Sequence, residues 1–192
     1  IYRPLSPDSI ADRILGMDTC SNGLVIGQKA TEEKSNEITA IPKLLELIKI
    51  KGCIVTIDAM GCQKEIAEKI IEDEGDYVLS LKGNQGSLHA DIKLNFEGLR
   101  EEVLHEKTSY YHSSVDADHG RIETRKYWIT DDIDWLAQKE DWPGFKSVGI
   151  VESQREINGV SSSERRYFIS SISPDAKVFA NAVRSHWLVE NS

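Results

Sequence analysis

Asp58 is the first residue whose type and position could do chemistry. It directly follows a continuous apolar run at residues 53–57, and ligand sites in α/β sheets gather at the carboxyl ends of strands. Position alone leaves two interpretations open: a ligand or catalytic group, or an aspartate that only caps or solvates the loop.

Glu190 is the second candidate, because it lies on an apolar stripe near the end of the sequence. Positions i, i+4, i+7, i+8 and i+11 share one face of a helix. Here they hold Phe179, Val183, His186, Trp187 and Glu190. Because a buried unpaired carboxylate is costly, a glutamate on such a face usually has a cation, a metal or a hydrogen-bonding partner. The alternative is that the helix frays there and the side chain reaches water.

The elements that must position Asp58 form a βαβ unit. Residues 53–57 are rich in β-branched side chains, as in a strand that is covered on both faces. The apolar spacing of residues 63–74 predicts a helix with Gly75 as its stop, and residues 77–81 predict the next strand. Such a unit places its two strands parallel in one sheet.

Upstream of this unit, the Asn-Gly dipeptide at residues 22–23 is typical of a hairpin turn. It predicts a strand that ends near Asp18 and a second strand at residues 23–29. Asn36 can cap a helix whose apolar residues recur at helical spacing.

Downstream, an amphipathic helix follows Gln85, and the pattern then changes to short alternating strands with turn residues between them. The Asn-Gly pair at residues 158–159 predicts another hairpin. Ser173, Pro174 and Asp175 predict a helix start, with serine as cap, proline first and an acid near the positive end of the helix dipole. The expected strands are residues 107–114, 121–130, 147–155 and 166–170.

We therefore expect one α/β domain over residues 1–192, with a mixed sheet and flanking helices. Its core takes about residues 10–104 and 172–192. A β-rich insertion at about residues 105–171 precedes the last helix.

The composition limits the kind of protein. A formal net charge of −9 argues against a domain whose whole surface binds DNA, so any DNA contact is expected from a local basic patch. Three cysteines without a CxxC pair favour neither a disulfide framework nor a thiolate zinc site. With no signal-peptide pattern and no apolar stretch near the roughly 18 to 20 residues of a membrane helix, a cytoplasmic protein without a membrane partner is expected.

Five ordered segments match one known family. They are residues 33–42 (EKSNEITAIP), 55–63 (VTIDAMGCQ), 77–85 (YVLSLKGNQ), 119–125 (HGRIETR) and 184–191 (RSHWLVEN). On these segments the chain, from about Gly23 to Asn191, resembles the bacterial insertion-sequence DDE transposases of the H-repeat-associated type. The resemblance implies a ribonuclease H-like fold.

In that family three carboxylates bind two divalent metal ions, Mg²⁺ or Mn²⁺. The resemblance gives the second role to Asp58 and the third to Glu190. Two metal ions clamp the attacking and leaving oxygens of an in-line displacement at phosphorus; water attacks first, and the freed 3′-OH attacks next. The resemblance also implies insertion-sequence ends and target DNA as partners, and a homodimer as the active form.

The sequence departs from the family in two places. The family carries its first aspartate in an Asp-Gly-Lys segment, and this chain has none; its upstream aspartates are Asp8, Asp12 and Asp18. Related transposases have a tyrosine and an arginine seven and four residues before the late glutamate, where this chain has Val183 and His186. We expect a core that is truncated at both ends, in which a residue such as Asp18 could stand in for the absent ligand.

Seven other residues are candidates for DNA contact. Three follow the strand beside Asp58 and would face the same sheet edge, with solvated loop residues as the alternative. Arg121 and Arg125 lie on one strand face with Glu123 and Tyr127. This pattern fits either a DNA-backbone surface or an exposed ion-paired face. Two lie on the late helix, where a structural histidine is the alternative for the second. The seven are Lys82, Asn84, Gln85, Arg121, Arg125, Arg184 and His186.

Two functions remain open on these grounds. One is a transposase catalytic domain that cleaves and transfers DNA strands. The other is an inactive remnant, without the first aspartate, that keeps the fold and some DNA binding or self-association. A stand-alone nuclease of the same fold needs the same complete carboxylate set.

Overall fold

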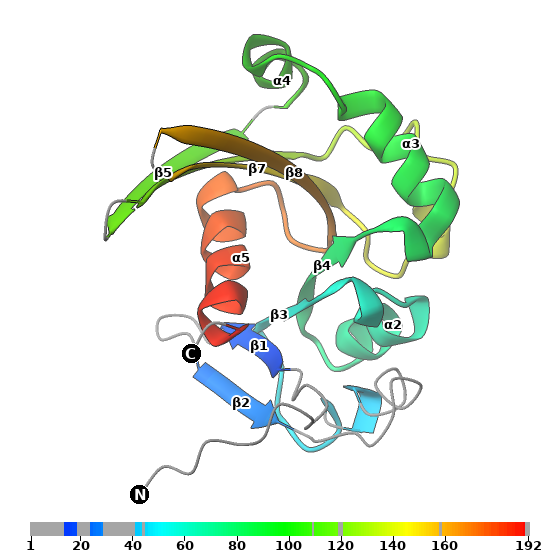
Figure 1. Cartoon of the computed structure of the whole chain (residues 1–192). Coiled ribbons are helices and arrows are strands. Elements are labelled where there is room, and N and C mark those ends of the chain that lie inside the picture. The colour runs from blue at the N-terminus through cyan, green and yellow to red at the C-terminus, as the bar shows by residue number, and fades with distance from the viewer. Residues whose placement is uncertain are drawn as a thin grey trace, which may run out of the picture.

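The computed structural model describes residues 14–18, 24–28, 41–43, 45–108, 110–118, 121–157 and 159–190. In this part of the chain an eight-stranded mixed sheet carries helices on both faces (Figure 1). The strand order is β2-β1-β3-β4-β8-β7-β6-β5. The strands are β1 (Ile14–Asp18), β2 (Leu24–Gln28), β3 (Ile54–Ile57), β4 (Asp76–Leu81), β5 (Tyr110–Asp118), β6 (Arg121–Thr130), β7 (Ser147–Ile157) and β8 (Val160–Ser170). The longer helices are α2 (Lys64–Glu72), α3 (Gly86–Phe96), α4 (Glu101–Lys107) and α5 (Ala176–Glu190).

The predicted βαβ unit is confirmed. β3 and β4 pair in parallel, with Ile57 opposite Leu79, and α2 connects them. α2 ends earlier than the sequence predicts, because Glu74, and not Gly75, takes the left-handed conformation, at φ 59°. The carboxyl ends of β3 and β4 therefore lie at the same edge of the sheet.

The predicted hairpin of β1 and β2 is also confirmed, and β1 pairs antiparallel with β3. The helix expected from Asn36 begins outside the described residues, and the described part shows helical turns at residues 41–43 and 45. Within the described chain, no helix is long and apolar enough to cross a membrane.

The four predicted β-rich strands form an antiparallel series, β5 to β8, that continues the same sheet. β8 pairs with β4 through residues 167–170, and β7 and β8 pair as the predicted hairpin, with Ile157 opposite Val160. β8 begins at Val160, earlier than predicted. The sequence did not reveal this first half, because its side chains are exposed and lack the apolar alternation that marks a half-buried strand. The sequence also missed α4, so β5 begins at Tyr110 and not at residue 107, and it runs on to Asp118. The division into a core and an insertion stays a prediction.

The predicted last helix is present, but it starts two residues later than predicted, at Ala176, and has a different cap. The Asp175 carboxylate accepts hydrogen bonds from the backbone N–H groups of Lys177 (2.9 Å) and Val178 (3.0 Å). Asp175, and not Ser173, is therefore the cap of α5. An aspartate there also places its negative charge at the positive end of the helix dipole.

Two apolar layers hold the sheet. Side chains of α2 and α3 pack on one face, and α5 covers the other through Phe179 and Val183. The Phe179 ring meets the rings of Tyr127 (6.2 Å between centroids) and Phe168 (5.5 Å) edge to face. It also lies directly over Gly149 of β7, where an added Cβ would stand 2.3 Å from the ring. The lack of a side chain at Gly149 therefore allows α5 to pack this close to the sheet.

We expect Gly149→Ala to destabilise the fold by about 1–3 kcal/mol, because the methyl group overpacks the contact with the Phe179 ring. Urea unfolding of the purified chain measures this loss. Gly86→Ala is the matched control, because a Cβ at that helical position meets nothing within 4 Å. Equal stability of the two variants would contradict the packing described here.

Candidate functional site

Asp58 stands at the carboxyl end of β3, half-buried. Its side chain caps a short 3-10 helix, η2 (Ala59–Gly61), by accepting a hydrogen bond from the backbone N–H of Met60 at 3.1 Å. The sequence left a capping role open for this aspartate, and the cap is present. It holds the carboxylate at the sheet edge, where the strand meets the loop.

The loop after Asp58 is tied to the loop after β4. Asn84 donates its side-chain amide to the carbonyl oxygen of Ala59 (2.5 Å), and Gln85 donates to that of Cys62 (2.6 Å). Both donors come from the second 3-10 helix, η3 (Gly83–Gln85). These two amides therefore fasten the Asp58 loop, a positioning role that the sequence did not predict for them.

Cys62, at the end of this loop, is a buried, neutral thiol. Burial, and then the negative charge of Asp58, raise the pKa of Cys62 to about 12. A thiol with that pKa carries almost no thiolate at neutral pH and is not a nucleophile. Chemistry at this edge therefore depends on oxygen and nitrogen groups.

Asp18 lies at the other end of β3. Its backbone pairs with Ile54, the first residue of the strand, whereas Asp58 follows the last. Four residues of strand span roughly 13 Å. This register gives no support to Asp18 as a stand-in ligand beside Asp58.

Glu190 is the last residue of α5, a helix that packs against β1 and β3 as well as β5 and β6. The side chains of Glu190 and His186 lie outside the described part of the chain. In the described part, no group of three His, Cys, Asp or Glu residues could hold a metal ion. The Asp58 carboxylate has the chemistry of a metal ligand, but by itself it does not make a metal site.

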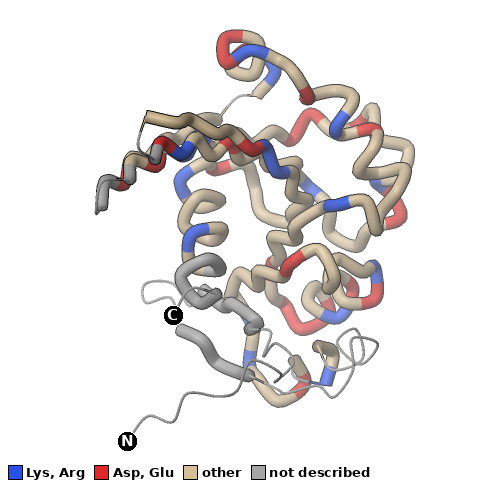
Figure 2. Tube along the Cα trace, in the orientation of Figure 1, with Lys and Arg blue, Asp and Glu red and all other residues tan. Residues whose placement is uncertain are grey.

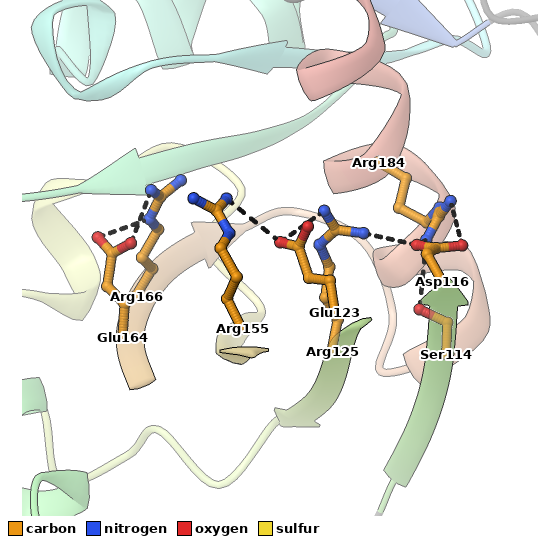
Figure 3. Close-up of polar contacts among 8 residues, drawn as sticks. All are labelled: Ser114, Asp116, Glu123, Arg125, Arg155, Glu164, Arg166 and Arg184. Carbon is orange, nitrogen blue, oxygen red and sulfur yellow. Dashed lines mark hydrogen bonds and ion pairs between the residues drawn. The ribbon is translucent and has the colours of Figure 1, made fainter. Parts of the chain in front are cut away.

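The candidate arginines on the α5 side of the sheet are held in a chain of ion pairs (Figure 3). Asp116 of β5 bridges Arg184 of α5 and Arg125 of β6, at 2.7 Å to each. Arg125 also pairs with Glu123 (2.8 Å), which in turn pairs with Arg155 (3.6 Å). The hydrogen bond from Arg184 is the main reason that the pKa of Asp116 is lowered.

The ion pairs fit the ion-paired interpretation of this face, but its centre is covered, whereas Asp116 and Arg155 at its two sides remain nearly half exposed. The side chain of Arg125 is 15% exposed and that of Glu123 only 8%. The side chain of Arg121 lies outside the described residues. Sequence reasoning missed Asp116, although Asp116 pairs directly with Glu123 in the β5–β6 register and so belongs to the same face.

A mixed sheet with a carboxylate at the end of its central parallel strand, crossed by a late helix that ends on a glutamate, is the arrangement of a ribonuclease H-like DDE transposase core. The model of the family described as "Transposase DDE domain" matches residues 14–192. The chain therefore belongs to this family, of the H-repeat-associated type.

Three curated relatives support the assignment. The chain is 49% identical over 157 residues to an uncharacterized protein in the dhlA 3′ region of Xanthobacter autotrophicus, covering 82% of this chain and 52% of that protein. It is 44% identical over 186 residues to the H repeat-associated putative transposase YhhI of Escherichia coli K12 (94% and 48%), and 44% over 175 residues to the putative transposase YncI of Escherichia coli O157:H7 (89% and 44%). The chain thus spans about half the length of these relatives. No solved structure matches it.

We expect Asn84→Ala to loosen the Asp58 loop, because it removes a hydrogen bond that joins the ends of β3 and β4. The loss of stability should be about 1 kcal/mol, and the loop amides of Met60 and Gly61 should exchange hydrogen faster. Native-state hydrogen exchange measures this. Asn95→Ala on α3 is the control, since its side chain contacts Lys107 and not the loop; unchanged exchange at Met60 and Gly61 in Asn84→Ala would contradict the fastening role.

Proposed function

We propose that this chain is the main part of the catalytic domain of an insertion-sequence transposase, which cleaves DNA strands and transfers them with Mg²⁺ or Mn²⁺. The observation that supports this most is the position of Asp58, a half-buried carboxylate at the shared carboxyl edge of β3 and β4. Membership of the transposase family gives the reaction class. Phosphoryl transfer needs little covalent chemistry from the protein, so the placement of ligands matters most.

Asp58 and Glu190 are the residues proposed to hold the metal ions. When bound, two divalent ions supply charge neutralisation at the attacking and leaving oxygens. The contribution of the chain itself is rigidity: the Met60 N–H fixes one oxygen of Asp58, and Asn84 and Gln85 fix the loop behind it. A carboxylate held in this way has less freedom to lose when it binds a cation.

The partners in this proposal are the insertion-sequence ends and the target DNA. The active form is proposed to be a homodimer in the bacterial cytoplasm. DNA has to be bound by local cationic groups, because the net charge of the whole chain is −9.

The alternative is a catalytically inactive remnant of a transposase that keeps the fold and some DNA binding or self-association. One observation favours it: the sequence has no Asp-Gly-Lys segment. The two functions differ in one property, which is metal binding at Asp58 and Glu190.

Titration calorimetry with Mg²⁺ and Mn²⁺ separates the two functions. For the catalytic domain we expect binding that both Asp58→Asn and Glu190→Gln abolish, because each removes one charged ligand at nearly constant size. Asp131→Asn is the matched control, an exposed aspartate at the end of β6, and it should bind metal as the parent chain does. Absence of binding at millimolar metal would instead favour the remnant.

Cleavage of a DNA duplex that carries the element's ends then tests the chemistry. Asp58→Asn should lower the metal-dependent cleavage rate at least 100-fold, since loss of a ligand removes transition-state charge stabilisation, while its unfolding midpoint stays close to that of the parent chain. Cleavage by Asp58→Asn at the rate of Asp131→Asn would refute the assignment.

A further inference from the structure

A surface cavity of about 170 Å³ lies where β4 ends. β4 stops at Leu81, but its neighbour β8 extends well past it toward Val160. Lys82 follows the end of β4, and His89 and Lys93 line the cavity from one face of α3. Their spacing of four residues places these two α3 side chains one helical turn apart.

The acidic residues that line the cavity already have partners. Glu97 accepts a hydrogen bond from the Tyr167 hydroxyl at 2.5 Å, and Glu164 pairs with Arg166 at 2.9 Å. The hydrogen bond and charge of Glu97, after burial, raise the pKa of Tyr167 well above its usual value. Glu164 is therefore already paired with a cation, whereas Glu97, which accepts from a neutral hydroxyl, keeps its negative charge.

Lys82 and Lys93 are the cations that remain. Both are exposed. Within the described ranges no contact of 4 Å or less joins either lysine to an acid, although, after the hydrogen bond from Arg166, the charge of Lys82 also lowers the pKa of Glu164. Across the described chain, acidic and basic positions are otherwise interspersed (Figure 2). Two unpaired ammonium groups beside one cavity form the kind of local positive patch that an acidic chain needs to bind a phosphate.

His89 adds a neutral hydrogen-bonding group to the cavity lining, one helical turn from Lys93. Burial, and then the positive charge of Lys93, lower its pKa, so its imidazole is uncharged at neutral pH and can donate one hydrogen bond. On β8, the groups on the α3 side are the Tyr167 ring, 6.1 Å away edge to face, and Arg165, which pairs with Glu152 at 2.6 Å. Glu164 and Arg166 alternate onto the opposite face of the strand (Figure 3).

We propose that this cavity binds a phosphate group, with Lys82 and Lys93 as its cations and His89 as a hydrogen-bond donor. The group is assigned to the DNA backbone, which rests on the proposed function. Lys82 and Asp58 follow neighbouring parallel strands, so a DNA strand that reaches Asp58 runs along the same sheet edge as the cavity. The cavity would then hold a DNA phosphate next to the phosphate that reacts at Asp58, and it would fix the position of the DNA strand.

The first experiment uses inorganic phosphate and needs neither DNA nor a metal. NMR titration gives the pKa of His89 in chloride and in phosphate at equal ionic strength. A bound anion favours the imidazolium, so phosphate should raise this pKa in the parent chain. The rise should disappear in the double variant Lys82→Gln/Lys93→Gln and persist in Lys146→Gln. No rise in the parent chain overturns the proposal.

Lys146→Gln is the control for each single substitution, because it removes one positive charge at the opposite end of β4. Lys146 is exposed and directly precedes β7, and its backbone N–H donates to Ser170. Thermal unfolding of each variant shows whether the fold is intact. Single substitutions Lys82→Gln and Lys93→Gln replace the double variant if that variant does not fold.

The second experiment identifies the source of the phosphate. Fluorescence anisotropy with a DNA duplex in EDTA should show roughly tenfold weaker binding by the double variant at about 0.1 M salt, and a salt slope lower by about 1 to 2. Lys146→Gln should match the parent chain. A phosphate effect on His89 without any change in DNA affinity would overturn the DNA assignment and point to a free phosphate compound.

These outcomes are separate from the test of Asp58. EDTA removes the metal, so the comparison of DNA affinities does not depend on whether Asp58→Asn abolishes catalysis. Weaker DNA binding by the double variant, with Asp58→Asn unchanged, supports the cavity whether or not the chain is catalytic.

Discussion

The contact between the Phe179 ring and Gly149 is the constraint on which the architecture depends. It brings α5 onto the sheet at β7, and from there the helix runs past β3 and β1 to Glu190. The same helix carries Arg184, whose ion pair with Asp116 ties it to β5. Because one helix contacts both the β5–β8 series and the strands around Asp58, the β-rich region helps to set where the late glutamate stands.

The other face of the sheet supplies a different kind of restraint around Asp58. Here the packing of α2 and α3 is apolar, but the loop itself is held by amide donors from Asn84 and Gln85. Neutral amides restrain backbone without adding charge, which suits a site whose proposed ligands are carboxylates. The excess positive charge lies one strand further on, at Lys82 and Lys93. Proposed metal ligands and the proposed phosphate site thus occupy one sheet edge without neutralising each other.

Local patterns predicted most of the elements, and the exceptions have physical reasons. The βαβ unit and both Asn-Gly hairpins follow from short-range turn chemistry and apolar runs. The first half of β8 was missed because its side chains are exposed, so cross-strand pairing with β7 and not burial makes it a strand. The cap of α5 was misplaced because Ser173 and Asp175 are both good capping residues, and only the backbone path selects Asp175.

The sequence by itself determined the family, the order of the strands along the chain and the place of Asp58 after a buried strand, because each is written in consecutive residues. Only the tertiary structure decided which groups meet: Asn84 with Ala59, Asp116 with Arg184, and Lys82 with His89 and Lys93 around one cavity. These partners are far apart in the chain or on separate elements. Their contacts depend on strand order, on register and on the seating of α3 and α5, which no local pattern of residue types specifies.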